Sequence, residues 1–129
     1  MSASEYNKIS GQIVHSAIEV HKILGPGLLE SVYEKTLIWE MKQNGLYIKR
    51  QTPIDIQYKN LEIKKGYYAD IIVNNKIILE IKAIENILPV HKAQLLSYLK
   101  LTDLRLGLLL NFHVPKMVNG ITRIINGYL

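Results

Sequence analysis

Two acids and a lysine with a short, regular spacing are the residues of this chain best suited to chemistry. Asp70 is followed by Glu80 ten positions later and by Lys82 twelve positions later, all within apolar, strand-like sequence. Alternate residues of a β-strand share a face, so Glu80 and Lys82 point to one side and the apolar residues around them point to the other. Glu80 and Lys82 alone could form a plain ion pair at a sheet edge. Two carboxylates and a lysine on interior strands also suit a divalent-metal site in which the lysine positions or stabilises a nucleophile.

The chemistry of such a site follows from the donor atoms. Mg²⁺ and Mn²⁺ prefer oxygen ligands, and Asp70 and Glu80 would supply carboxylates while the backbone carbonyl of Ile81 would supply a third oxygen. An ion of this kind neutralises a phosphate and lowers the pKa of an attacking water, as hydrolysis of a phosphodiester requires. Lys82 would orient that water, stabilise charge on phosphorus, or act as a base if burial lowers its pKa.

The turn between the two strands tests this interpretation. If Asn74 and Asn75 formed a simple two-residue hairpin, Asp70 would lie opposite Leu79 and on the wrong face for Glu80. The metal-site hypothesis therefore predicts an unusual loop or a bulge here. Asparagine tolerates the left-handed backbone conformation that such a turn needs.

Length and composition indicate one small domain spanning residues 1–129, and the order of its predicted elements, given below, indicates the α/β class. The net charge is +5 with a pI near 9.4, which favours a polyanionic partner without specifying one. The chain has no cysteine, which excludes thiolate metal sites and a disulfide framework. Its polar N-terminus does not resemble a signal peptide, and it has no apolar stretch of the roughly 20 residues that a membrane span needs. We therefore expect a cytoplasmic protein.

Hydrophobic periodicity and turn residues predict the order of the elements. Two N-terminal helices are separated by Gly25-Pro26-Gly27. A third helix before the apolar strand at 104–111 suits a crossover between parallel strands, which predicts a mixed sheet with helices packed on it. The predicted helices span 5–24, 28–44 and 90–101. The predicted strands span 47–58, as one bent or two short strands, and 61–63, 68–73, 76–81, 104–111 and 121–125.

Several motifs resemble one family. The GxxExxY protein family is similar to this chain at Gly27-Leu-Leu-Glu30-Ser-Val-Tyr33, at the preceding Ile18-Glu-Val-His21 and Gly25-Pro26, and at Gly107-Leu-Leu-Leu-Asn-Phe112. That family is regarded as a branch of the PD-(D/E)XK nuclease superfamily. The resemblance implies a restriction-endonuclease-like core with a mixed central sheet flanked by helices. It also places Asp70, Glu80 and Lys82 at the motif positions, with Ala69 where the superfamily's name has proline.

The resemblance and the helical spacing extend the predicted site. Gln94 and Tyr98 resemble the Gln-x-x-x-Tyr element of the exonuclease-like branches, and His91 lies one helical turn before Gln94. These three residues are candidate substrate contacts, and Gln94 is also a candidate catalytic residue, because this polar stripe could hold Lys82, a metal-bound water or a substrate phosphate. Glu30 and Tyr33 share a helix face. Glu30 is a candidate additional metal or water ligand, with a role at the helix start as the alternative.

The two tyrosines also have a second interpretation. Tyr33 is a candidate substrate contact together with Tyr98, but the alternative, packing of the ring with a hydrogen-bonded hydroxyl, is the preferred interpretation of both residues.

The preferred hypothesis is a Mg²⁺- or Mn²⁺-dependent nuclease that hydrolyses nucleic acid, with DNA as the expected substrate, by direct attack of a metal-activated water. The alternative is a non-catalytic nucleic-acid-binding or protein-interaction module with the same fold. A metal site for a different substrate also fits the sequence. A homodimer is compatible with the family resemblance, and the apolar segment 121–129 is its candidate interface if it lies at a sheet edge.

Overall fold

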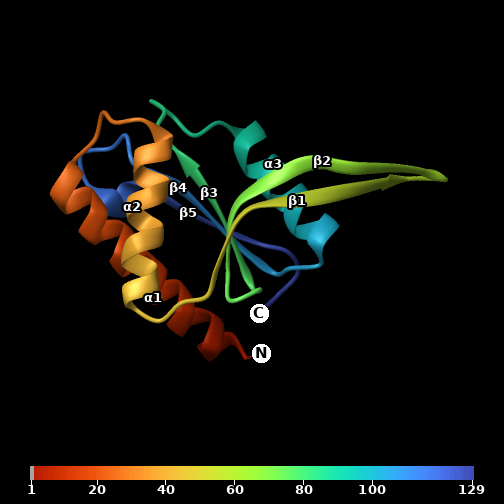
Figure 1. Cartoon of the computed structure of the whole chain (residues 1–129), viewed down its shortest axis with the longest axis horizontal. Coiled ribbons are helices and arrows are strands. Elements are labelled where there is room, and N and C mark those ends of the chain that lie inside the picture. The colour runs from red at the N-terminus through yellow and green to blue at the C-terminus, as the bar shows by residue number, and fades with distance from the viewer. Residues whose placement is uncertain (1) are drawn as a thin grey trace.

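The computed structural model describes residues 2–129, in which helices and strands follow one another as Figure 1 shows. The elements are α1 (Ala3–Leu24), α2 (Glu30–Gln43), β1 (Ile48–Tyr58), β2 (Leu61–Val73), β3 (Ile77–Lys82), α3 (Pro89–Thr102), β4 (Leu106–Asn111), the 3-10 helix η1 (Met117–Gly120) and β5 (Ile121–Ile125). The predicted order of helices and strands is confirmed.

The five strands form one mixed sheet in the order β1-β2-β3-β4-β5. β3 and β4 are parallel, and the other neighbours are antiparallel. A parallel pair needs a long crossover connection, which α3 provides between β3 and β4. The α/β class with a mixed sheet is therefore confirmed, and the arrangement is consistent with a restriction-endonuclease-like fold.

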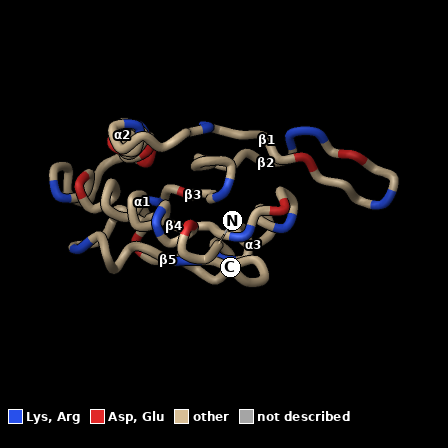
Figure 2. Tube along the Cα trace, turned by 90° about the horizontal axis from the view of Figure 1, so that it is seen from below, with Lys and Arg blue, Asp and Glu red and all other residues tan. Residues whose placement is uncertain are grey.

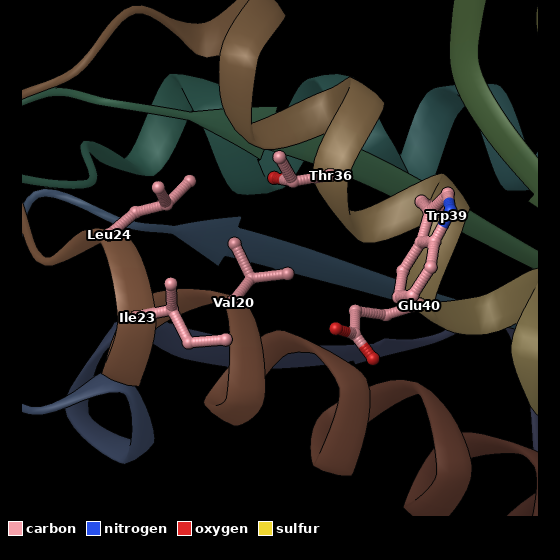
Figure 3. Close-up of a pocket in the computed structure, with 6 residues that line it drawn as sticks. All are labelled: Val20, Ile23, Leu24, Thr36, Trp39 and Glu40. Atoms are coloured by element: carbon pink, nitrogen blue, oxygen red, sulfur yellow. The ribbon is translucent and has the colours of Figure 1, made fainter.

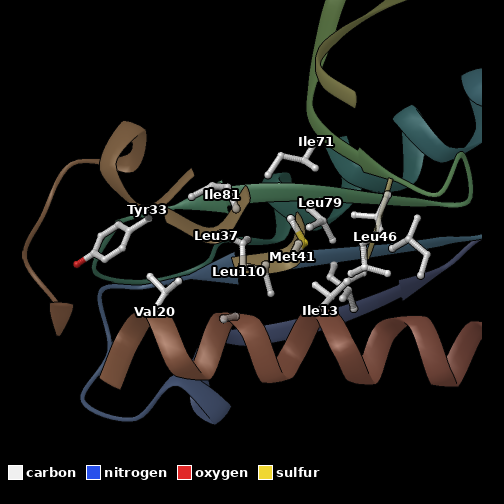
Figure 4. Close-up of a cluster of buried hydrophobic side chains, with 14 of the residues drawn as sticks. Ile13, Val20, Tyr33, Leu37, Met41, Leu46, Ile71, Leu79, Ile81 and Leu110 are labelled. Atoms are coloured by element: carbon white, nitrogen blue, oxygen red, sulfur yellow. The ribbon is translucent and has the colours of Figure 1, made fainter. Parts of the chain in front are cut away.

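Helices α1 and α2 cover one face of the sheet. Their buried side chains, among them Ile13 and Leu37, form a cluster with Leu79 of β3 and Leu110 of β4 (Figure 4). The apolar stripe that predicted the first helix is thus the stripe that packs on the sheet. This cluster is the larger of the two hydrophobic clusters in residues 2–129.

Helix α3 covers the opposite face with a smaller cluster. Leu95 and Leu99 of α3 pack with Ile78 of β3 and Leu109 of β4. The helix approaches β4 closely at Gly107, where an added Cβ would lie 2.9 Å from side-chain atoms of Leu95. The site described below lies on this face of the sheet.

Strands β1 and β2 continue past the rest of the sheet as a two-stranded arm, on the right of Figure 1. The sequence predicted two short strands, 61–63 and 68–73, but β2 runs through both. The pairing with β1 continues across an irregularity after Ile54, and the backbone N–H of Lys65 donates to Asp55 Oδ1 at 2.7 Å. Acidic and basic residues are interspersed along the arm (Figure 2).

Strand β5 forms the edge of the sheet opposite β1. The candidate interface 121–129 therefore lies at an edge, with Ile125 and Tyr128 exposed. A homodimer formed through this edge stays a prediction. Within residues 2–129, no helix is both long and apolar enough to span a bilayer.

Candidate metal and substrate site

The turn between β2 and β3 determines which residues of the two strands face each other. Val73 pairs with Ile77, so three residues form the connection. Asn74 and Asn75 both adopt left-handed backbone conformations, with φ angles of 52° and 55°. The predicted departure from a two-residue hairpin is confirmed, and the resulting register brings the two predicted acids opposite each other.

Asp70 and Glu80 lie side by side where the regular pairing of β2 and β3 ends. The backbone N–H of Ile81 donates to Asp70 Oδ2 at 2.8 Å, and the backbone N–H of Asp70 donates to Glu80 Oε1 at 3.3 Å. Each carboxylate therefore accepts a hydrogen bond from the neighbouring strand, in the place where a backbone carbonyl would otherwise accept it. These contacts fix both acids relative to the sheet.

Glu80 is a buried acid with little compensation for its charge. Its residue is only 6% exposed, and burial together with the nearby Asp70 carboxylate raises the pKa of Glu80 to about 9. The positive charge of Lys82 lowers this pKa, but its effect is smaller than those of burial and Asp70. A cation bound between two carboxylates held in this way would stabilise their ionised forms.

Lys82 ends β3 and is half-buried beside the loop that leads to α3. The side chain of Asn111 on β4 holds that loop, because its Oδ1 accepts from the N–H of Ile84 at 3.1 Å and its Nδ2 donates to the Ile84 carbonyl at 2.9 Å. Phe112 N–H also donates to the Lys82 carbonyl at 2.9 Å. The backbone on both sides of Lys82 is therefore fixed. Strand alternation places its side chain on the same face as Glu80.

Helix α3 packs Tyr98 against the face of the sheet that carries the acid pair. Burial is the main cause that raises the pKa of Tyr98 to about 12, and the charges of Glu80 and Asp70 contribute in the same direction. The hydroxyl group therefore keeps its proton and can donate it to a hydrogen bond near the carboxylates. Gln94 lies one turn earlier and is exposed, in a groove that Tyr67 and Tyr98 also line.

His91 has a different environment from Gln94 and Tyr98, the other two candidate substrate contacts on α3. Its Nδ1 accepts a hydrogen bond from the backbone N–H of Leu88 at 2.9 Å, at the start of α3. This contact is typical of a residue that satisfies free N–H groups at a helix N-terminus. In this structure the ring thus stabilises the helix start.

Tyr33 is fully buried and has the packing role that was the alternative interpretation. Its ring stacks on Phe112 with centroids 4.5 Å apart, and its hydroxyl donates to the Gly25 carbonyl at 2.6 Å and accepts from the N–H of Leu28 at 3.1 Å. These contacts leave no exposed surface for a substrate. The expectation that Tyr33 contacts substrate is corrected on this ground.

Glu30 is exposed at the first residue of α2. It lies one turn before Tyr33, whose partner Phe112 directly follows β4, so this helix start lies near the end of the sheet where Lys82 stands. Within residues 2–129, however, no three His, Asp or Glu side chains converge as a metal cluster. The structure does not bring Glu30 into direct contact with Asp70 and Glu80.

Glu34 is a buried acid that the sequence analysis did not single out. Its Oε1 accepts from Gln51 Nε2 at 3.1 Å and lies 3.4 Å from Arg50 Nε. Gln51 has a φ angle of 46° and occupies the position on β1 across from Asp70. Glu34 therefore ties α2 to the strand next to the acid pair. The sequence could have identified Glu34 as a candidate residue, because it lies one helical turn after Glu30 and two acids at this spacing share a helix face.

A second hollow lies between α1 and α2, on the other side of the molecule (Figure 3). Its lining is mainly apolar, including Val20, Ile23, Leu24 and Trp39, and it contains a single carboxylate, Glu40. With one acid and no cationic side chain, this hollow lacks the donor set of the site on the α3 face.

The donor set of the acid pair fits a hard divalent cation. Mg²⁺ in proteins is commonly held by one or two carboxylates, with water and substrate phosphate oxygens completing its coordination. Asp70 and Glu80 provide two carboxylates, and Glu80 is buried without an equivalent positive partner. A bound cation would supply the missing charge.

Comparison with known proteins agrees with this geometry. Residues 7–124 match the PD-(D/E)XK nuclease superfamily, whose members generally use divalent metal ions. No curated protein and no solved structure matches the chain. Because the matched segment covers nearly the whole sequence, the chain belongs to the PD-(D/E)XK nuclease superfamily.

Proposed function

We propose that this protein is a metal-dependent nuclease that hydrolyses phosphodiester bonds in nucleic acid, with DNA as the favoured substrate. We also propose that it belongs to the GxxExxY branch of the superfamily, on the basis of Gly27, Glu30 and Tyr33. The observation that carries the proposal is the pairing of Asp70 with Glu80 across β2 and β3.

Asp70, Glu80 and the backbone carbonyl of Ile81 are the proposed ligands of Mg²⁺ or Mn²⁺. The N–H and carbonyl groups of one strand residue point to the same side, and the N–H of Ile81 donates to Asp70, so its carbonyl faces the same strand. When bound, a divalent ion neutralises phosphate charge and lowers the pKa of the attacking water.

The remaining residues act on the substrate and on the water. The ammonium group of Lys82, on the Glu80 face of β3, orients the water or stabilises the negative charge that develops on phosphorus. The Tyr98 hydroxyl, which keeps its proton, donates to an oxygen near the acid pair, and Gln94 offers an amide to the substrate strand. His91 supports the start of the helix that carries both residues.

Glu30 has a more distant role in this proposal. Its exposed carboxylate at the start of α2 contributes through water, near the end of the sheet that carries Lys82. An acid that acts through water affects the rate less than a direct ligand does.

A cleavage assay tests the proposal. Purified protein is incubated with labelled single-stranded DNA, duplex DNA and RNA in Mg²⁺ or Mn²⁺, with an EDTA control. The variants are Asp70→Asn and Glu80→Gln, which keep the size of each side chain and remove its charge. Glu85→Gln removes an exposed acid from the loop after Lys82 and serves as the matched control.

We expect metal-dependent cleavage that falls by about a thousandfold or more in Asp70→Asn and Glu80→Gln and is unchanged in Glu85→Gln. Equal cleavage by wild type and both acid variants would contradict the proposed site. If no substrate is cleaved although the protein binds nucleic acid, the non-catalytic binding module becomes the better interpretation.

A further inference from the structure

A groove lies between the base of the β1–β2 arm and helix α3, next to the acid pair. Tyr67 of β2 forms one wall, and Gln94, Ser97 and Tyr98 of α3 form the other. Tyr67 precedes Asp70 by three strand residues, which corresponds to about 10 Å along β2. Tyr98 packs in the same buried cluster as Ile78, the β3 residue that precedes Glu80 on its face, so the groove lies on the face of the sheet that carries the acids.

The two tyrosines form a supported aromatic surface. The ring centroids of Tyr67 and Tyr98 are 5.4 Å apart, with an interplanar angle of 44°. Tyr98 is buried, whereas Tyr67 is 45% exposed. Tyr98 therefore backs the Tyr67 ring on one side and leaves the rest of that ring open to a ligand.

The other lining groups add hydrogen-bonding capacity without charge. Gln94 contributes an amide and Ser97 a hydroxyl, while Val90 and Leu101 are apolar. No acidic or basic side chain lines the groove in the part of the chain that the structure describes. Such a lining does not suit a phosphate. It suits a flat, uncharged group with polar edges.

A nucleobase has these properties, and the neighbouring acid pair is proposed to act on the backbone that carries nucleobases. We propose that the groove binds one unpaired nucleobase next to the scissile phosphate, with Tyr67 stacking on the base and Gln94 and Ser97 contacting its edge. A paired base has both faces covered by its neighbours in the duplex and would first have to leave the stack. The substrate at this site is therefore a single strand or an unpaired end.

This inference rests on the proposed nuclease function but is tested by binding. The background is Glu80→Gln, in which the bound strand stays intact, and the probe is a labelled single-stranded DNA oligonucleotide in Mg²⁺, with the same sequence as a duplex for comparison. Tyr67→Leu removes the ring and Tyr67→Phe keeps it. Tyr68→Leu is the matched control, because Tyr68 is a neighbouring tyrosine of β2 with 48% exposure that does not line the groove.

Tyr67→Leu should weaken single-strand binding by about tenfold, since base–aromatic stacking is worth roughly that much or more in affinity. Tyr67→Phe and Tyr68→Leu should stay within about twofold of the background on the same scale. Replacing one base by an abasic site, tried at each position in turn, should reproduce the loss at one position. Combined with Tyr67→Leu, it should add little.

Three results would overturn the inference: an equal loss in Tyr67→Leu and Tyr68→Leu, an equal loss on duplex and single strand, or no effect of abasic substitution at any position. Thermal unfolding of each variant shows whether a loss reflects misfolding, and Tyr67→Phe reports on the ring if Tyr67→Leu is unstable.

The two proposals fail in different ways. Metal-dependent cleavage with normal binding by Tyr67→Leu rejects the base site and keeps the nuclease. Base-dependent binding that requires Tyr67, in a wild-type protein that cleaves nothing, rejects the nuclease and keeps the base site. A protein that binds no nucleic acid rejects both.

Discussion

Strand β3 has two chemically different faces. Leu79 and its alternate neighbours Ile77 and Ile81 lie fully buried under α1 and α2, in an unbroken hydrocarbon environment. On the other face, Ile78 is equally buried under α3, but the next residue on that face is Glu80. Both faces bury their side chains at this level of the sheet, and only one of them places a titratable group there.

The difference shows how the fold separates stability from chemistry. Apolar burial on the α1–α2 face stabilises the sheet. On the α3 face, the same rigid strand holds Glu80 against Asp70 in an environment that disfavours ionisation, as the raised pKa of Glu80 shows. Packing on one face therefore stabilises the strand that keeps an unfavourable acid pair in place on the other.

Leu79→Ala should give the largest change in stability. Leu79 is fully buried in the larger cluster, and truncating a buried leucine leaves a cavity that costs about 3 kcal/mol of unfolding free energy. Urea unfolding followed by circular dichroism measures this loss. The protein that remains folded should keep its metal-dependent cleavage. A loss below about 1 kcal/mol would mean that the cluster repacks and that the α1–α2 face contributes less to the free energy of unfolding than its burial indicates.

Glu80→Gln should change stability in the opposite direction. The pKa of Glu80 is about 9 in the folded protein and near 4.5 when unfolded, so between these values the folded state holds a proton that the unfolded state has lost. The wild-type free energy of unfolding therefore falls as pH rises from about 5 to 9. The variant lacks this decline and should be more stable by on the order of 2 kcal/mol at pH 8 in EDTA.

Unfolding measured from pH 5 to 9 checks this difference, and the two proteins should converge near pH 5. Mg²⁺ or Mn²⁺ should stabilise wild type and leave Glu80→Gln nearly unchanged. Glu85→Gln is the control for the loss of an acid at an exposed position. A wild-type pH profile parallel to that of Glu80→Gln would contradict the burial cost assigned to this carboxylate.

The contrast between the two faces of β3 was predictable from the sequence because strand alternation depends only on local order. Alternation assigned Leu79 and Glu80 to opposite faces, and the chemistry of the two asparagines allowed the turn that brings Asp70 opposite Glu80. The helix boundaries also followed from periodicity and breakers, within two residues at each end.

Features that depend on tertiary contacts were not predictable. The sequence predicted separate strands at 61–63 and 68–73, but the irregular pairing with β1 carries β2 through both, which produces the arm. The contact of Tyr67 with Tyr98 joins residues 31 positions apart, and that of Glu34 with Gln51 crosses from a helix to the sheet. Periodicity identifies which residues of an element are apolar, but it does not identify which elements meet.

Glu30→Gln should change stability less than Leu79→Ala or Glu80→Gln does, and it tests whether the site extends to the start of α2. Glu30 is exposed at the start of α2, where a carboxylate complements the helix dipole, so its loss should cost about 0.5 kcal/mol or less of stability. If the carboxylate also acts through water, cleavage falls by about tenfold in Glu30→Gln and largely recovers in Glu30→Asp. Ser31→Ala, in the same exposed turn, is the control. Unchanged cleavage in Glu30→Gln would confine Glu30 to the helix start and would leave the whole of the chemistry on the α3 face of the sheet.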